Sequence, residues 1–226
     1  MAEATKKPAD PRTVQLKRVR LSFADSLKDK KPTVKDGVPK HSCNFILESD
    51  SPTYEENREK VKKALIAAGE QFNGQPELYK RIMEDDPKRL CYRKGERFKN
   101  TEGEVYKGYA GNWAISASGP GGNKNPRRPK LFDRSRKEVP ESEILDVCYS
   151  GSYADVILSF YGTDTGGLGI FASIEAIRSL QEGERTGGGV YVDASDFDEV
   201  DDADDAFEGT SAAGLGVSSA ADEDEI

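Results

Sequence analysis

The chain has 226 residues, of which 35% are hydrophobic, and its mean hydropathy of -0.71 is low for a chain that folds throughout its length. Its formal net charge of -8 is unevenly placed: residues 1–192 carry 33 basic and 28 acidic residues, a net charge of +5, whereas residues 193–226 carry thirteen acidic residues and no basic one. The length allows one domain or two small ones. The lack of a long apolar run argues against a membrane span. The segregated charge favours a nucleic-acid partner for the basic part of the chain.

The N-terminal segment predicts a disordered leader followed by a strand. Residues 1–12 combine charged, small and proline residues, and from residue 13 the sequence becomes apolar enough for a strand. Val19, Leu21 and Phe23 fall on one face of this strand. The apolar residues before them have the opposite parity, so the strand either starts near Lys17 or contains a β-bulge there.

Residues 41–47 predict a second strand, and helices are expected after it. A capping box at Thr53–Glu56 begins the longer helix, apolar residues then recur at spacings of three and four, and either Gly69 or Gly74 ends it. Residues 76–85 predict a shorter helix with a proline in its first turn.

The second half of the chain predicts further strands. Residues 109–117 predict a strand that places Tyr109, Trp113 and Ile115 on one face, and residues 118–126 have the composition of a loop. Residues 144–163 predict two strands that meet near Gly151.

A short amphipathic helix is expected over residues 169–183, with Gly183 as its end. Its inward-facing residues are Phe171, Ile174, Ile177 and Leu180.

The strands do not alternate regularly with helices, which argues against a parallel α/β sheet. The sequence therefore predicts a mainly β (α+β) fold with short helices, an OB-fold-like small barrel over residues 13–186. Residues 187–226 are low in complexity and acidic, and we expect this tail to be disordered.

Residues for catalysis or metal binding are scarce. His41 is the single histidine and is interpreted as an ordinary strand residue, and isolated carboxylates such as Asp164 are expected to be solvated. The three cysteines are widely separated and form no CxxC pair, which favours a reduced intracellular compartment. The sequence therefore predicts a protein that is not an enzyme and that needs no metal and no cofactor.

Basic and aromatic residues alternate between Arg89 and Arg136, a pattern typical of single-stranded nucleic-acid binding, because cations follow the phosphates and flat rings stack on exposed bases. For Trp113, packing in the core and stacking on a base are equally compatible with the pattern. The candidate DNA-binding residues are Tyr92, Arg93, Lys94, Arg97, Phe98, Tyr106, Lys107, Tyr109, Trp113, Arg127, Arg128 and Lys130.

The acidic tail is interpreted as a competitor for the basic groove, because a tethered polyanion resembles nucleic acid in charge and is present at high effective concentration. Once displaced by DNA, it would be free to bind other proteins. The candidate partner-binding residues are Phe207, Asp222, Glu223, Asp224, Glu225 and Ile226.

The chain resembles the single-stranded-DNA-binding proteins of tailed phages, a group long known only as a phage domain of unknown function. The resemblance rests on three blocks, which begin with RVRLSFAD, GEVYKGYAGNWAISAS and CYSGSYADVILSFYG and together span most of residues 13–189. The family motif also matches at Tyr109, Trp113 and the Arg128-Pro129 pair.

The resemblance implies an OB-fold that coats single-stranded DNA without sequence preference during phage replication, recombination or repair. It also implies that the tail recruits replication or recombination proteins, and that the protein acts in the cytoplasm of the infected bacterial host. The terminal Ile226 departs from the aromatic residue that ends many such tails.

Other functions remain open at this point. Duplex DNA or RNA is an alternative partner, a metal-dependent phage nuclease would need a carboxylate cluster in the folded part, and a pure protein-interaction module would use the tail alone.

Overall fold

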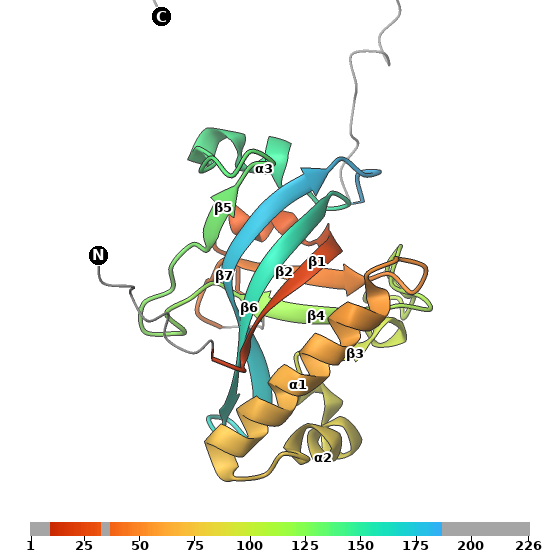
Figure 1. Ribbon diagram of the computed structural model, residues 1–226, viewed down its shortest axis with the longest axis vertical. Helices are drawn as coiled ribbons and strands as arrows, with labels where there is room; N and C mark the ends of the chain where they lie inside the picture. Colours follow the sequence, from red (N-terminus) through yellow and green to blue (C-terminus); the bar gives the residue numbers. More distant parts are fainter. Residues whose placement is uncertain (1–9, 33–36, 187–226) are drawn as a thin grey trace, which may run out of the picture. The chain divides into compact units, whose positions relative to one another are not determined.

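Strands dominate the computed structural model, which describes residues 10–32 and 37–186 (Figure 1). The strands are β1 (Thr13–Ser22), β2 (Ser42–Leu47), β3 (Tyr92–Lys94), β4 (Trp113–Ser118), β5 (Lys130–Phe132), β6 (Tyr153–Thr163) and β7 (Gly169–Gln181). The helices are α1 (Tyr54–Asn73), α2 (Leu78–Asp85) and the short α3 (Ile144–Val147). Most of the predicted leader and all of the predicted tail, including Phe207 and Asp222–Ile226, lie outside the described residues.

The strands pair in the order β3-β4-β2-β1-β6-β7-β5, and β4 also pairs with β7. This additional pairing is parallel and joins Ala117 to Ala172 and Ser118 to Ser173. As a result β1, β2, β4, β7 and β6 form a closed ring of pairings, with β3 and β5 added outside it. The predicted fold class, mainly β with short helices, is confirmed.

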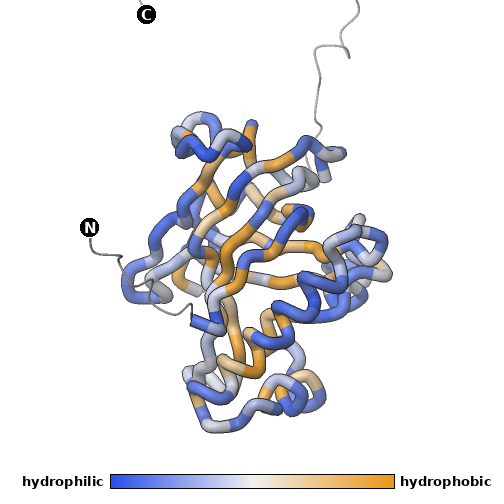
Figure 2. Tube along the Cα trace, viewed as in Figure 1, coloured by the Kyte–Doolittle hydropathy of each residue, from blue (hydrophilic) through white to orange (hydrophobic). Residues whose placement is uncertain are grey.

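Apolar residues concentrate along the strands, whereas the helices α1 and α2 carry many hydrophilic residues (Figure 2). The ring encloses the main hydrophobic core because alternate side chains of each strand point inward. α1 packs against β1 and β6, and its Val61, Leu65 and Ala68, which follow the predicted helical spacing, belong to the main core cluster. The largest fully buried strand residues are Leu16, Leu21, Phe45, Leu47, Ile115 and Phe160.

A β-bulge interrupts β1 between Leu16 and Val19, which confirms the bulge alternative for this strand. Arg18 there adopts a left-handed conformation with φ of 48°. The bulge leaves backbone groups without strand partners, and two buried side chains bind them. Asn57 of α1 accepts from the Lys17 N–H (3.0 Å) and donates to the Lys17 carbonyl (2.7 Å), while Asp155 of β6 accepts from the Arg18 N–H (3.1 Å).

The long helix is confirmed, but its predicted capping box is wrong. Thr53 occupies the N-cap position without accepting from a backbone N–H of the first turn, and its hydroxyl instead donates to the Lys17 carbonyl at 3.0 Å. The hydrogen bond from the Thr53 hydroxyl to β1 therefore takes the place of a capping hydrogen bond within the helix. Of the two glycines predicted to end the helix, Gly74 does so in the left-handed conformation, with φ of 63°.

The helix predicted over residues 169–183 is wrong, because this segment forms strand β7. Ile170, Ala172 and Ile174 alternate inward, and a bulge at Glu175 then shifts the parity so that Ile177 also faces the core. The bulge places two buried residues three positions apart, a spacing that imitates a helix face.

Two further strand predictions need correction. The segment expected to form a first strand from residue 144 is the short helix α3, and only the second strand, β6, exists. The strand expected from Tyr109 begins at Trp113, because Gly108 and Gly111 both have positive φ and turn the chain. Tyr109 therefore lies in a turn, in a different cluster from Trp113 and Ile115.

Replacing Asn57 by Ala should lower the free energy of unfolding by about 2 kcal/mol, because the Lys17 N–H at the bulge loses its acceptor and the Lys17 carbonyl loses one of its donors. Urea unfolding measures the difference. Glu59→Ala, at an exposed position of the same helix, is the matched control and should stay within about 0.5 kcal/mol of the unsubstituted protein. Equal stability of the two variants would contradict the role assigned to Asn57.

Candidate nucleic-acid interface

A groove of about 1500 Å³ lies over the outer faces of β2 and β4. Cys43 and Phe45 of β2 and Ala117 of β4 point into the core, so the residues between them face outward. Ser42 lies opposite Ser118, and Asn44 lies opposite Ser116. The four residues that form the groove floor are therefore small and polar: Ser42, Asn44, Ser116 and Ser118.

Positive charge predominates along the groove. Among the described residues that line it, seven are Lys or Arg and two are acidic, so its potential attracts anions. The basic residues come from the loop before β2, from the turn before β3, and from β3 and the segment after it. They are Lys31, Lys40, Lys88, Arg93, Lys94, Arg97 and Lys99, and the acidic residues are Asp86 and Glu96.

Arg93 is the basic residue held most firmly against the groove floor. Its Nη2 donates to Ser116 Oγ at 3.0 Å, and its guanidinium carbon lies 4.4 Å from the centre of the Phe98 ring. Burial lowers the pKa of the guanidinium, which nevertheless remains charged at neutral pH. Its Nε is enclosed without a hydrogen-bond partner, and no carboxylate in the described part of the chain pairs with it. Arg93 thus offers an uncompensated cation to a bound anion.

A second hydrophobic cluster, Ile46, Phe98, Tyr109 and Ala114, lies beside the groove floor on the same outer face of β2 and β4. The Phe98 and Tyr109 rings lie 4.7 Å apart between centroids, and the Tyr109 hydroxyl accepts from Asn44 Nδ2 at 2.9 Å. Burial raises the pKa of Tyr109 to about 12, so this hydroxyl stays protonated at neutral pH. The cluster fixes Asn44 in the groove floor.

Several rings predicted to stack on bases are buried. Tyr109 is 0% exposed, and Phe98 and Tyr92 are each 7% exposed, which leaves little ring face for a base. Tyr92 stacks on Trp113 with centroids 4.6 Å apart, and Trp113 packs against the main core. Tyr92 and Trp113 therefore pack with the main core, whereas Phe98 and Tyr109 belong to the second cluster on the outer face.

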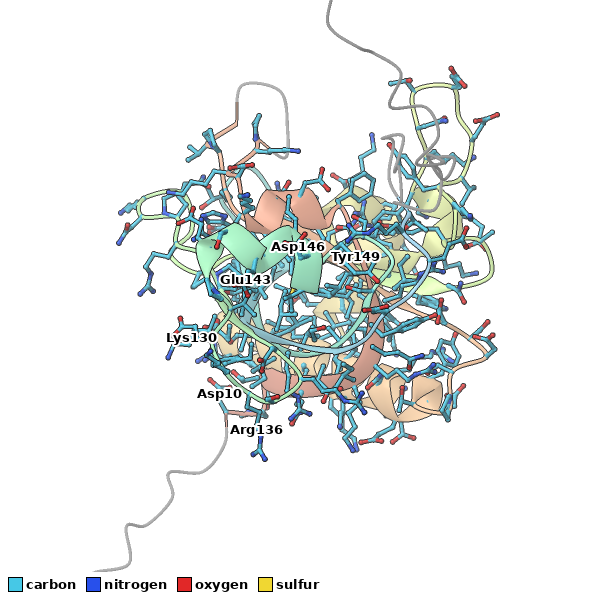
Figure 3. The ribbon with its side chains drawn as sticks, turned by 90° about the horizontal axis from the view of Figure 1, so that it is seen from above. Asp10, Lys130, Arg136, Glu143, Asp146 and Tyr149 are labelled. Atoms are coloured by element: carbon cyan, nitrogen blue, oxygen red, sulfur yellow. The ribbon has the colours of Figure 1, made fainter. Side chains whose placement is uncertain are left out.

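Other candidates lie outside the groove lining. Lys107 forms an ion pair with Glu184 at 2.6 Å, and Arg128 forms one with Glu141 at 2.6 Å. Lys130 belongs to β5, outside the ring, and points away from the body, as Arg136 does (Figure 3). Of the twelve predicted residues, the groove lining contains Arg93, Lys94, Arg97 and Phe98; Tyr92, Tyr106, Lys107, Tyr109, Trp113, Arg127, Arg128 and Lys130 lie elsewhere.

The sequence analysis missed three aromatic residues that line the groove: Phe23, Tyr161 and Phe171. Phe23 was expected on the same strand face as Val19 and Leu21, which are buried, but it follows the end of β1 and is 43% exposed. Tyr161 of β6 lies opposite Phe171 of β7, and their ring centroids are 6.3 Å apart. Strand parity would have identified Tyr161, because its neighbour Phe160 is buried in the core.

Neither a metal site nor a membrane span is found within residues 10–32 and 37–186. No three His, Cys, Asp or Glu residues of that part are placed to hold a metal ion, and none of its helices is both long and apolar enough to cross a membrane. His41 is buried with its Nδ1 3.3 Å from the Ser26 carbonyl, and burial lowers its pKa. His41 was expected in a strand but lies directly before β2, which begins at Ser42.

Comparison with known proteins identifies the family. The model of the family described as "Enterobacter phage Enc34, ssDNA-binding protein" matches residues 12–207, and the chain therefore belongs to this family of phage proteins. Protein p50 of Acyrthosiphon pisum secondary endosymbiont phage 1 is 28% identical over 190 residues, which cover 83% of this chain and 93% of that protein. The resemblance inferred from the sequence blocks is thus confirmed.

Solved structures of similar fold come from the same family. The single-stranded DNA-binding protein of bacteriophage Enc34 in complex with ssDNA superimposes with a TM-score of 0.62 at 17% identity, covering 80% of this chain and 97% of that one. Another structure of the Enc34 protein gives a TM-score of 0.58 at 19% identity, covering 84% of this chain and 96% of that one. These likenesses support the predicted fold.

Proposed function

We propose that this chain is a non-enzymatic protein that binds single-stranded DNA in the groove over β2 and β4 without reading its sequence. The observation that carries the proposal is the groove itself, which combines a floor of small polar side chains with seven Lys or Arg residues against two acids. A polyanion with unpaired bases fits this combination, since cations bind phosphates and the narrow side chains of the floor leave room for bases. The Enc34 relative, which was solved in complex with ssDNA, supports the same assignment.

The position of the groove on the fold also supports this function. OB-folds bind oligonucleotides on the outer face of their second and third strands, which correspond to β2 and β4 in the ring described above. Basic side chains of the groove would contact phosphates, and its aromatic side chains would stack on base rings. Because every base has a ring face, this binding would tolerate any sequence. Duplex DNA should bind less well, because its paired bases cannot reach the floor.

The acidic tail suggests how binding is regulated. The thirteen acidic residues over 193–226 carry no compensating basic residue, so by charge alone they would compete with DNA phosphates for cations of the same chain. We infer that DNA displaces the tail and that the released end, Phe207 and Asp222–Ile226, then recruits proteins of phage replication or recombination.

Replacing Arg93 by Met should weaken binding to an oligo(dT) probe and make it less sensitive to salt. For single strands, each neutralised phosphate contributes about 0.7 to the slope of log K against log salt, so the slope should decrease in magnitude by about 0.7. Fluorescence anisotropy between about 50 and 200 mM salt measures both quantities. A duplex probe of equal length shows whether the protein binds single-stranded DNA more tightly than duplex DNA.

The matched control for Arg93→Met is Lys62→Met, which removes one charge from an exposed position of α1 outside the groove lining. This control should leave the affinity and the slope close to those of the unsubstituted protein. If the two variants behave alike, Arg93 contacts no phosphate; if the unsubstituted protein fails to bind oligo(dT), the proposed function is wrong.

Deleting residues 193–226 should raise the affinity for oligo(dT) at low salt, because the competing charge is removed. The gain should shrink as salt is added, since salt screens the tail as well as the DNA. A tail of the same length with Asn and Gln in place of Asp and Glu separates charge from bulk and should behave like the deletion. Unchanged affinity of the deletion variant at low salt would exclude competition.

A further inference from the structure

Phe23 combines three features that glycine or a small polar residue would be expected to share only in part. It directly follows β1, its backbone is left-handed with φ of 56° and ψ of 37°, and its side chain is 43% exposed. A bulky residue pays a steric penalty in this conformation, which glycine adopts freely. An exposed ring also returns little free energy from burial.

The backbone on both sides of Phe23 explains why the chain turns there. Leu21 is buried, and its N–H and C=O bond to the Ser152 carbonyl (2.9 Å) and the Gly151 N–H (2.8 Å). Ala24 is also buried, and its N–H donates to Ser150 Oγ at 3.0 Å. With its flanks held in this way, residue 23 makes the reversal between β1 and the following turn. The turn requires a left-handed residue, but it does not require an aromatic one.

The other described residues with positive φ that are not glycine have local explanations. Arg18 lies in the bulge of β1, where Asp155 accepts its N–H, and Arg136 lies in a turn closed by its N–H bond to the Asp133 carbonyl (3.0 Å). At Phe23 the turn accounts for the left-handed backbone, but the exposed ring makes no contact with the buried core that would account for an aromatic side chain there. Residues with strained backbones cluster at binding sites.

The left-handed turn directs the Phe23 ring to the groove. The ring lines the groove together with Lys31, and it packs edge-on against Tyr106, with centroids 5.1 Å apart at an interplanar angle of 86°. Tyr106 is itself 37% exposed, so it supports one side of the Phe23 ring without covering it. An exposed ring face beside a lysine is suited to a base and its phosphate.

The location of Phe23 extends the aromatic surface along the groove. β1 pairs with the start of β6 through Arg20 and Tyr153, whereas Tyr161 lies near the other end of β6. Phe23 and the pair of Tyr161 and Phe171 therefore lie toward opposite ends of β6, and the floor of small polar residues belongs to the same groove.

We propose that Phe23 is a base-stacking residue of this protein, held in its left-handed conformation so that its ring faces a base in the groove, and supported from the side by Tyr106. The inference rests on the proposed binding of single-stranded DNA and adds a specific contact to it. The ligand of this site is an unpaired nucleobase, of any identity, because stacking uses the ring face.

The test compares variants of the full chain at position 23. Phe23→Gly should weaken oligo(dT) binding roughly 5- to 150-fold, the factor for the loss of one base stack, and should unfold at or above the temperature of the unsubstituted protein because glycine relieves the strain. Phe23→Leu keeps apolar bulk without a ring and should lose affinity to a similar extent. Phe23→Tyr keeps the ring and should retain the affinity.

Ile157→Ala is the matched control, since Ile157 is an exposed apolar residue of β6 (38%) outside the groove lining, and its affinity should not change. Unchanged binding by Phe23→Gly or by Phe23→Leu would overturn the proposal. A clear fall in the melting temperature of Phe23→Gly would also overturn it, because the ring would then serve the fold. Failure of the unsubstituted protein to bind oligo(dT) would instead refute the proposed function.

Discussion

Pairing of β4 with β7 over Ala117–Ser118 and Ala172–Ser173 closes the sheet into a ring, and closure fixes which side chains face inward. Because side chains alternate along a strand, a closed ring has one enclosed face and one outer face. The enclosed face holds the main core, including Phe45 and Ile115. The outer face of β2 and β4 carries the small polar residues of the groove, beside Ile46 and Ala114, which are buried in the second cluster.

The groove in turn depends on how the ring is supported at its irregular points. The bulge in β1 is compensated by Asn57 and Asp155, and Asp155 also pairs with Arg178 of β7. On the outer face, the cluster around Tyr109 holds Asn44, and Ser116 holds Arg93. A positively charged surface that is fixed before the ligand arrives loses less side-chain entropy on binding.

The sequence was sufficient to predict several of the strands, the long helix and the kind of ligand, but not the site. Strand parity identified β1 and β2, and helical spacing identified α1, because these depend on local periodicity. Helical spacing also led to the wrong prediction of a helix where β7 lies, because the bulge at Glu175 places buried residues three positions apart, as in a helix. Clustering of basic and aromatic residues indicated single-stranded DNA correctly at the level of the family. The clustering of these residues could not show that Tyr109 is buried whereas Arg93 lines the groove, nor could it identify Phe23 as a groove residue. Both results depend on turns, at Gly108 and at Ser22–Ala24, that bring distant segments together.

Hydrogen–deuterium exchange with and without bound oligo(dT) tests most directly whether the outer face of β2 and β4 is the binding surface. The account predicts slower exchange in peptides covering β2 (42–47), residues 92–99 and β4 (113–118), which border the groove. Peptides of α1 (54–73), which packs on β1 and β6, should exchange as they do in the free protein. Protection confined to α1 or to β5, with none over β2 and β4, would contradict the account.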